Sequence, residues 1–296
     1  MKREYVLVTT AYNEEDYIEK TITSVLSQSQ RPKRWVIVSD GSTDGTDDII
    51  RKYLPKHSYM LFVRRERDGR KYTKPKAFKL GYRLLSGCEY DYVGSLDADL
   101  SFDSHYFENL LLRFEHNSKM GLAGGEIHDV HHGQFKARPT NSESHVAGGV
   151  QLFKRACFET IGGFLPLEYG GEDGIADVMA RMRGWEVRSF SDLPVFHHRA
   201  SGTGIRNVFL RGINNGKRDY FVGSSPSYFL LKCIYHSRDM PYVLVSLMMV
   251  VGYCWAGLQR QARVVPLDAI KRRRQEQMDR FAHHVLSKIR RSRQDA

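Results

Sequence analysis

The pattern of hydrophobic and polar residues along the first hundred positions predicts strands that alternate with helices. Short apolar runs rich in β-branched and aromatic residues predict buried strands at 5–9, 35–39, 59–63 and 90–96. Between the strands, apolar residues recur every three or four positions, as in the helix predicted over 74–85. Strands that alternate with helices predict a parallel sheet covered on both faces, as in a Rossmann-like nucleotide-binding half.

Polar residues mark the expected starts of two of these helices. Asn13 is expected to cap the helix that carries Ile18 and Ile22, with Asp16 completing a partial capping box. Thr46 or Asp47 is expected to cap the next helix, after a turn rich in glycine and polar residues. Each cap is therefore expected to follow closely on the end of a strand.

The pattern changes after about two hundred residues, where helical spacing replaces the alternation. We expect a catalytic domain at 1–204, with a nucleotide-binding half at 1–100 and an acceptor half at 101–204, followed by a helical C-terminal region at 205–296. Within that region, residues 240–259 form an uncharged, largely apolar stretch. Its length only just reaches the roughly 20 residues that a membrane-spanning helix needs.

Charge is distributed unevenly along the chain. The formal net charge is +11, and residues 260–296 contribute 11 Lys and Arg against 4 Asp and Glu, a net of +7. No basic segment interleaved with base-stacking aromatics on a recognised module is present, so nucleic acid is not expected as a partner. The basic tail instead favours an anionic membrane surface.

The remaining composition indicates an ordinary folded protein of a reducing compartment. Hydrophobic residues make up 41% and charged residues 27%, which argues against disorder. The basic N-terminus is followed by too short an apolar run for a signal peptide. The cysteines are widely spaced, without the pattern of a zinc site or a disulfide framework: Cys88, Cys157, Cys233 and Cys254.

Two carboxylates follow the strand predicted at 90–96. Asp97 and Asp99 lie two positions apart where the chain must turn, so both side chains can face one site. Ligands of open α/β sheets bind at that edge, and two neighbouring carboxylates repel each other unless a cation lies between them. Hard oxygen ligands suit Mg²⁺ or Mn²⁺ shared with a diphosphate. Taken alone, the Asp-x-Asp (DXD) motif is more often a polar turn with a helix cap.

Several further segments, taken together with this motif, resemble a known family. Residues 9–15, 38–46 and 96–99, in this order, resemble glycosyltransferase family 2, whose members have a GT-A fold. Later segments continue the likeness to about residue 200: Gly148–Phe153, Ile161–Phe164, Gly171–Asp173, Arg181 and Gly184–Trp185.

The resemblance implies a nucleotide-sugar donor and assigns residues to it. Asp40, at a strand end, could accept a hydrogen bond from the base, although a loop cap is its alternative, and Tyr12 offers a ring face. Lys76 matches the basic donor contact, whereas Arg64, Arg65 and Arg67 are expected to be solvated. The full set of expected donor contacts is Ala11, Tyr12, Glu14, Asp40, Lys76, Asp97 and Ala98.

The same resemblance implies a metal site completed by a histidine. Asp99 is the expected ligand of Mn²⁺ or Mg²⁺, and His198 is preferred to His197 as the second protein ligand. The remaining histidines of this half, His128, His131 and His132, lack a fixed ligand spacing and are expected in a mobile loop near the acceptor.

A second pair of acidic residues opens the helix predicted to end near Arg183. Acidic residues in a first turn are often only caps, but the two preceding glycines and the family likeness favour Asp173 as a general base. Glu172, Gly148 and Gly149 are assigned to the acceptor side. One base, no evident nucleophile and a leaving diphosphate imply inversion of configuration at the anomeric carbon.

We therefore expect a metal-dependent, inverting, hexosyltransferase-type enzyme acting on a lipid-linked or polysaccharide acceptor. The alternatives are a sugar nucleotidyltransferase, for which residues 9–15 lack the required glycine-rich phosphate loop, and a nucleotide-binding membrane-assembly protein without transfer activity. One-sided attachment to the cytoplasmic face of a membrane is favoured over a single span. A span would place the basic tail on the side opposite the nucleotide-sugar site, against the tendency of basic residues to stay on the cytoplasmic side. The C-terminal helices could also form a homo-oligomer.

Overall fold

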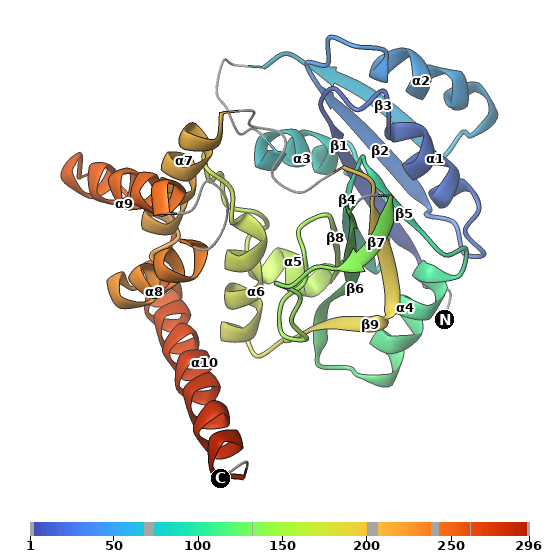
Figure 1. Cartoon of the computed structure of the whole chain (residues 1–296). Helices are drawn as coiled ribbons and strands as arrows, with labels where there is room; N and C mark the ends of the chain where they lie inside the picture. Colours follow the sequence, from blue (N-terminus) through green and yellow to red (C-terminus); the bar gives the residue numbers. More distant parts are fainter. Residues whose placement is uncertain are drawn as a thin grey trace. The chain divides into compact units, whose positions relative to one another are not determined.

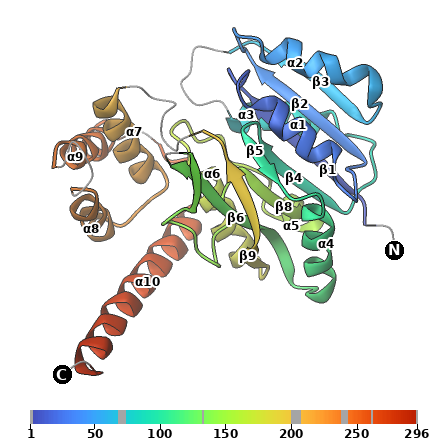
Figure 2. The ribbon, with the colours of Figure 1, turned by 45° about the vertical axis from the view of Figure 1, so that its right-hand side comes forward.

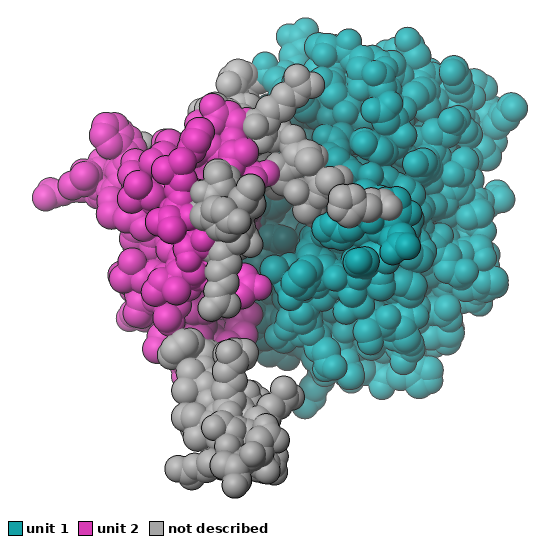
Figure 3. Space-filling model, viewed as in Figure 1, with its two compact units in different colours: residues 1–168, 172–203 teal, residues 169–171, 204–296 magenta. Residues whose placement is uncertain are grey.

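The computed structural model of the chain describes residues 3–67, 74–131, 133–199, 207–237, 243–260 and 262–294. The chain divides into two compact units, which Figure 3 distinguishes by colour. The first unit comprises residues 1–168 and 172–203, and the second comprises residues 169–171 and 204–296.

One mixed β-sheet forms the framework of the first unit (Figures 1 and 2). Its strands run in the order β3-β2-β1-β4-β8-β6-β9-β5, and β7 pairs with β6. Parallel pairing joins the first four strands, which are β1 (Tyr5–Ala11), β2 (Arg34–Asp40), β3 (Met60–Arg65) and β4 (Tyr92–Asp97). The remaining strands, joined mainly by antiparallel pairing, are β5 (Leu100–Phe102), β6 (Met120–His131), β7 (Gln134–Ala137), β8 (Val150–Lys154) and β9 (Glu186–His197).

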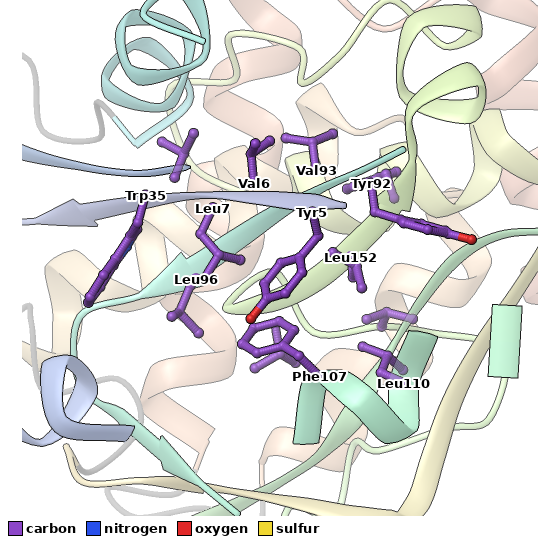
Figure 4. Close-up of a cluster of buried hydrophobic side chains, with 14 of the residues drawn as sticks. Tyr5, Val6, Leu7, Trp35, Tyr92, Val93, Leu96, Phe107, Leu110 and Leu152 are labelled. Carbon is purple, nitrogen blue, oxygen red and sulfur yellow. The ribbon is translucent and has the colours of Figure 1, made fainter. Parts of the chain in front are cut away.

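Helices cover both faces of this sheet. On one face, α3 (Lys74–Arg83) lies close enough that a Cβ at Gly81 would come within 2.6 Å of Val8. On the other face, α4 (Tyr106–His116) stacks Phe107 on Tyr5 with ring centroids 4.7 Å apart (Figure 4). The other helical elements of this unit are α1 (Ile18–Leu26), α2 (Thr46–Tyr53), the 3₁₀ turn Leu54–Lys56, α5 (Arg155–Thr160) and α6 (Glu172–Met182).

The predicted alternation of strand and helix is confirmed, and its boundaries shift by one to three residues. Strands β1 and β2 each extend beyond the predicted apolar run, to Ala11 and Asp40. The expected parallel half is therefore present within the mixed sheet, and it aligns the carboxyl ends of β1, β2 and β4.

The predicted helix caps are wrong. Asn13 has a left-handed backbone (φ 53°), and its side-chain oxygen accepts a hydrogen bond from Thr43 N–H at 2.8 Å instead of capping α1. Thr46 and Asp47 lie within α2, and the Asp44 carboxylate accepts from Thr46 N–H at 3.1 Å. Asparagine tolerates the left-handed region, so Asn13 joins two strand-end loops, a long-range contact that local spacing does not reveal.

The second unit is helical. Its helices are α7 (Val208–Phe221), α8 (Pro226–His236), α9 (Val243–Leu258) and α10 (Leu267–Gln294). Glycines let the backbones of α7 and α9 touch, since a Cβ at Gly216 would lie 1.9 Å from Met249 O and one at Gly252 would lie 2.1 Å from Ile213 O. A buried ion pair between Asp219 and Lys232, 2.7 Å apart, joins α7 to α8.

The apolar stretch predicted at 240–259 forms α9 from residue 243, and its first three residues lie outside the described residues. None of the helices in the described residues is long and apolar enough to cross a membrane.

Candidate active site

Strand ends and the turns that follow them gather the predicted donor residues around one pocket of the first unit. Thr10 of β1 pairs with Asp97 of β4, and Ala11 pairs with Ser39, so the polar residues that follow each strand meet at one edge. The residues that line the pocket are Thr10, Ala11, Tyr12, Glu14, Asp40, Arg67, Lys74, Asp97, Ala98 and Asp99. Six of the seven predicted donor contacts are among them, and Lys76 is not.

Lys74 takes the place in the pocket that the sequence assigned to Lys76. Its ammonium group forms an ion pair with Asp97 and lies 3.3 Å from the carbonyl oxygen of Gly148. Burial lowers the pKa of Lys74, but the negative charges of Asp97, Glu172 and Asp173 raise it further, so its pKa lies above the usual value. Lys74 is therefore held as a cation at the carboxylate edge.

Asp99 is buried beside His197. One carboxylate oxygen, Oδ2, lies 3.2 Å from His197 Nε2 and 3.6 Å from Arg199 Nε. Burial raises the pKa of Asp99, but the hydrogen bond with His197 and the nearby cations lower it more, and the carboxyl stays below its usual value. The other oxygen, Oδ1, is buried and has no hydrogen-bond partner within the described part of the chain.

The two adjacent histidines point to different partners. His197, the alternative in the sequence analysis, contacts Asp99, whereas the side chain of the preferred His198 lies 2.8 Å from Ser101 Oγ and edge-on to Phe135. His198 reaches Asp99 only through its backbone, whose N–H donates to the Asp99 carbonyl at 2.9 Å. His197 is the last residue of β9 and His198 follows it, and consecutive residues of an extended chain face opposite ways, so only one of the two imidazoles approaches the carboxylate.

Asp129 fixes the imidazole of His197, a contact that the sequence analysis missed. Asp129 Oδ1 lies 2.7 Å from His197 Nδ1, and Arg138 binds both oxygens of Asp129, at 2.8 and 2.9 Å. Burial lowers the pKa of His197, but its bonds to Asp99 and Asp129 raise it above the usual value. Asp129 comes from β6, and no spacing in the sequence links it to β9.

These residues fit a divalent cation that a substrate also helps to bind. The unpartnered Oδ1 of Asp99 is a free oxygen ligand, and an imidazole lies next to it. Among the described residues, no group of three or more His, Cys, Asp or Glu side chains is arranged to hold a metal ion by themselves. Mg²⁺ and Mn²⁺ sites commonly complete their ligand shell with substrate phosphates and water, so two protein ligands are compatible with such an ion.

Glu14 lies in the pocket with an unusual protonation equilibrium. Its carboxylate forms an ion pair with Arg199, and its backbone N–H donates to Thr46 Oγ1 at 2.7 Å. Burial and the charge of Asp99 raise the pKa of Glu14 to about 8, although Arg199 acts in the opposite direction. Glu14 thus changes charge near neutral pH.

Two arginines that the sequence analysis placed in solvent lie beside Asp40, and one of them, Arg67, lines the pocket. Arg65 forms an ion pair with Asp40, and Arg67 Nε lies 3.8 Å from the second oxygen of Asp40. The Arg67 guanidinium also stacks on the Tyr12 ring, 3.8 Å from its centroid. The expectation of a solvated run is therefore wrong for Arg65 and Arg67, because the buried Asp40 needs cationic partners; the half-exposed Arg64 pairs with Asp47.

Asp173 opens α6 beside the glycine pair. Its Oδ2 accepts a hydrogen bond from Gly148 N–H at 3.2 Å, and its Oδ1 accepts one from Gly174 N–H at 2.7 Å. A Cβ at Gly148 would lie 3.0 Å from Asp173 Cβ, and one at Gly149 would lie 2.7 Å from Asp97 Oδ2. The two glycines thus run between the carboxylates of Asp97 and Asp173, where no side chain would fit. Glu172 is buried next to Asp173.

The loop expected around the histidine cluster is a hairpin instead. His128 and His131 lie in β6, which pairs with β7, and His128 Nε2 lies 3.3 Å from Glu126. His132 lies outside the described residues.

Comparison with known proteins gives a family and a fold. The model of glycosyl transferase family 2 matches residues 6–162, more than half of the chain. A poly-beta-1,6-N-acetyl-D-glucosamine synthase of Staphylococcus aureus (strain MSSA476) is 33% identical over 114 residues, which are 38% of this chain and 26% of that protein. The corresponding synthase of Staphylococcus epidermidis is 32% identical over the same shares. The match thus covers about a quarter of the length of these relatives.

Solved structures share the fold. A mannosyltransferase of Pyrobaculum calidifontis, in complex with GDP-Man and Mn²⁺, superimposes with a TM-score of 0.58 at 18% identity, over 99% of this chain and 83% of that chain. TarS of S. aureus, residues 1–349, superimposes with a TM-score of 0.57 at 15% identity, over 90% of this chain and 82% of that chain. The same TarS fragment in complex with UDP-GlcNAc gives a TM-score of 0.56 at 14% identity, over 88% and 92%. The predicted GT-A fold is confirmed.

Proposed function

Because this chain belongs to glycosyl transferase family 2 and is a glycosyltransferase, we propose that it moves a hexose-type sugar from a nucleotide-diphosphate donor to an acceptor hydroxyl, with inversion. The acceptor we propose is a polysaccharide or a lipid-linked glycan, which the polysaccharide synthases among its relatives support. The catalytic residues are assigned to residues 1–204, with residues 205–296 as an accessory helical region.

The pocket supports a division of labour along the donor. Asp40 accepts a hydrogen bond from the base, Tyr12 contacts a face of the base, and the backbone at Ala11 lies close to it. Lys74 neutralises a diphosphate oxygen when it exchanges its ion pair with Asp97 for one with the substrate. We assign Asp97 to the ribose and diphosphate, and Ala98 and Glu14 to the wall of the same pocket.

Asp99 and His197 would hold Mn²⁺ or Mg²⁺, with His197 now preferred to His198 because it contacts Asp99. When bound, such an ion stabilises the negative charge that develops on the leaving diphosphate. Asp129 and Arg138 keep the His197 imidazole in place. Asp99 Oδ1, the buried oxygen without a partner among the described residues, is the observation that supports this assignment most directly.

Asp173 is the proposed general base. Its carboxylate accepts two backbone hydrogen bonds, which hold it in one orientation, and the glycine pair separates it from Asp97. A base at this place takes the proton of the acceptor hydroxyl while the diphosphate leaves from the opposite face of the anomeric carbon. Asp173 facing the Asp97–Asp99 edge across Gly148 and Gly149 is the single observation that carries the proposal.

A screen of nucleotide-sugars tests the function directly. We expect UDP-GlcNAc or GDP-Man, the donors bound by the structural neighbours, to raise the melting temperature of the full chain in the presence of Mn²⁺. Asp99→Asn should lose this shift and most donor hydrolysis while keeping the melting temperature of the unliganded protein. Unchanged turnover in excess chelator would contradict the metal assignment, and no response to any nucleotide-sugar would contradict the donor assignment.

The second unit supports attachment to one side of a membrane, on the cytoplasmic face. Apolar side chains form an exposed stripe along α9, with exposed fractions of 67% at Val243, 51% at Leu247 and 53% at Trp255. The next helix, α10, carries the basic run Lys271–Arg274 directly after its first four residues. Apolar insertion and attraction to anionic lipid would then act together. Alternatively, the same helices form a homo-oligomer, in which a second copy of the chain covers this stripe.

A further inference from the structure

A buried carboxylate lies one helical turn beyond the proposed base. Asp177 of α6 is 1% exposed, and two donors serve it. His145 Nδ1 lies 2.5 Å from Asp177 Oδ2, and Gln151 Nε2 donates to Asp177 Oδ1 at 3.2 Å. A buried carboxylate is costly unless it is paired, so these two donors compensate for the burial of Asp177.

The same residues connect the glycine loop to the first turn of α6. Gln151 is fully buried on β8, and its side-chain nitrogen also lies 3.1 Å from Val146 O and 3.4 Å from Asp173 O. His145 lies three residues before Gly148, the residue whose N–H donates to Asp173. The loop over residues 145–149 is therefore attached to α6 at both Asp177 and Asp173.

Asp177 also acts on Asp173 through its charge. Burial raises the pKa of Asp177 above its usual value, the hydrogen bond and charge of His145 lower it in part, and the charge of Asp173 raises it. Coulombic interaction is mutual, so the charge of an ionised Asp177 acts on Asp173 in turn. Other charged groups near these two carboxylates include Arg181, which also donates to Ser144 O, and Lys74, itself influenced by Glu172 and Asp97.

We propose that His145 and Asp177 form a positioning pair for Asp173, which holds the loop 145–149 against α6 and fixes the charge next to the base. The inference rests on the proposed role of Asp173 as general base. His145 acts through Asp177, and Asp177 acts through the helix and its charge, so neither needs to touch a substrate. With His145 protonated, its charge offsets that of Asp177, and Asp173 experiences a nearly neutral neighbour.

Two substitutions should move the titration of Asp173 in opposite directions. Asp177→Asn removes a negative charge about 6 Å away, so Asp173 should ionise at lower pH. His145→Gln keeps a hydrogen-bond donor but removes the positive charge, so the uncompensated Asp177 should make Asp173 ionise at higher pH. At an effective dielectric constant near 20, each midpoint should move by up to about two pH units. The double variant should return close to the wild type.

The midpoint can be read without any substrate. We would label the full chain with ¹³C at aspartate side chains, assign the Asp173 signal by its loss in Asp173→Asn, and titrate each variant by NMR in metal-free buffer. Amide exchange of the segment 145–151 supplies a second readout, and we expect it to accelerate in His145→Ala because the loop loses its attachment. If Asp177→Asn fails to fold, the partly exposed His145 still provides variants that test both effects.

A control and the contrary outcomes separate this inference from the proposed function. Asp219→Asn disrupts a comparably buried ion pair in the second unit, so it should lower stability without moving the Asp173 midpoint. Shifts of equal sign in the two variants, or no shift with unchanged exchange at 145–151, would overturn the positioning pair. If the shifts appear as expected but no nucleotide-sugar is bound or hydrolysed, the proposed function fails while the coupling to Asp173 stands.

Discussion

Single carboxylates in this site differ mainly in the groups that neutralise them. Asp97 meets an ammonium from α3, whereas Asp99 meets an imidazole and keeps one oxygen without a partner among the described residues. Asp173 accepts from two backbone N–H groups, that of Gly148 before β8 and that of Gly174 in the first turn of α6. A flexible cationic side chain such as Lys74 can turn from Asp97 to a bound substrate. Backbone donors cannot move in this way, so we expect the orientation of Asp173 to stay fixed when a substrate binds.

This difference leads to a prediction for Asp173. Asp173→Asn should leave the affinity for a nucleoside diphosphate within about two-fold, because the amide still accepts from Gly148 and fills the same volume. Transfer or donor hydrolysis should fall by about 10²–10⁴, the usual contribution of a general base. Isothermal titration with UDP or GDP and a turnover assay measure the two quantities.

The anomeric configuration of the product provides the matching check. A single displacement gives a product whose anomeric configuration is opposite to that of the donor, which NMR of the product reveals. Retention, or full activity of Asp173→Asn, would exclude the single-base mechanism.

Glu14 leads to a prediction about pH and stability. In the unfolded chain it ionises near its ordinary pKa of 4.5, but in the folded protein only near about 8. The folded state therefore binds more protons between these values, and the free energy of unfolding must fall as pH rises through that window. Glu14→Gln should flatten this fall and make the protein more stable than wild type above pH 8, by an amount on the order of 1 kcal/mol or more.

Chemical denaturation from pH 5 to 9 in metal-free buffer measures the effect. The exposed neighbour Glu15 supplies the control, since Glu15→Gln should leave the slope unchanged. A variant that is less stable than wild type at every pH would show that the Arg199 ion pair outweighs the burial of Glu14.

Residue types at strand ends were predictable, but their partners were not. Asp40, Asp97 and Asp99 follow apolar runs, and the rule that parallel strands end at one edge is enough to bring them together. The choice of Lys74 over Lys76 depends on how α3 is rotated, and the contact between Asp129 and His197 depends on two strands far apart in the chain. Such contacts are decided by packing across the sheet, which local spacing does not encode.

Hydrophobic periodicity predicted which segments form strands and helices, but it did not predict where these elements end. Strands β1, β2 and β4 are apolar runs that any buried strand would require. Asn13 failed as a cap because Thr43, thirty residues later, competes for its side chain. The hairpin of β6 and β7 was missed since every residue of β7 is exposed and gives no apolar alternation.

The contact between α7 and α9 leads to a prediction about the second unit. A Cβ at Gly216 would lie 1.9 Å from the carbonyl oxygen of Met249, so Gly216→Val must push two helix backbones apart. We expect a loss of several kcal/mol in the stability of this unit, comparable to severe overpacking. Circular dichroism melting should show a lower or separate transition, with nucleotide binding to the first unit retained.

Gly257 supplies a matched control on the same helix. A Cβ there would meet only Tyr220, at 3.5 Å, which is ordinary van der Waals contact. Gly257→Ala should therefore be neutral or slightly stabilising, because alanine is the better helix former. Equal losses in both variants would mean that any added side chain on α9 or α7 destabilises this unit, and that the close approach at Gly216 is not the cause.

The molecule as a whole combines a carboxylate-rich catalytic unit with a basic helical one. The net charge of +7 in residues 260–296 exceeds that of the rest of the chain. Besides the apolar stripe of α9, α8 exposes Leu230, Ile234 and Tyr235. A glycosyltransferase that acts on a lipid-linked acceptor gains from such a surface, because attachment raises the local concentration of its substrate.

Membrane attachment leads to the last prediction. A triple substitution on the stripe, Leu247→Gln, Val251→Gln and Trp255→Gln, keeps good helix formers at exposed positions and should leave the fold intact. Since a fully buried apolar side chain contributes about 1.5–3 kcal/mol, binding to vesicles of phosphatidylglycerol and phosphatidylcholine should fall at least about ten-fold. Co-sedimentation measures the bound fraction.

Salt and a control variant separate the two contributions to attachment. Raising salt should weaken binding of the wild type only in part, because it screens the basic residues and leaves apolar insertion intact. Leu84→Gln, at a position 42% exposed in the first unit, should bind as the wild type does. If the triple variant binds vesicles normally but sediments as a monomer where the wild type sediments as a dimer, a second copy of the chain covers the stripe. The membrane would then be reached through the basic residues alone, and high salt should release the protein completely.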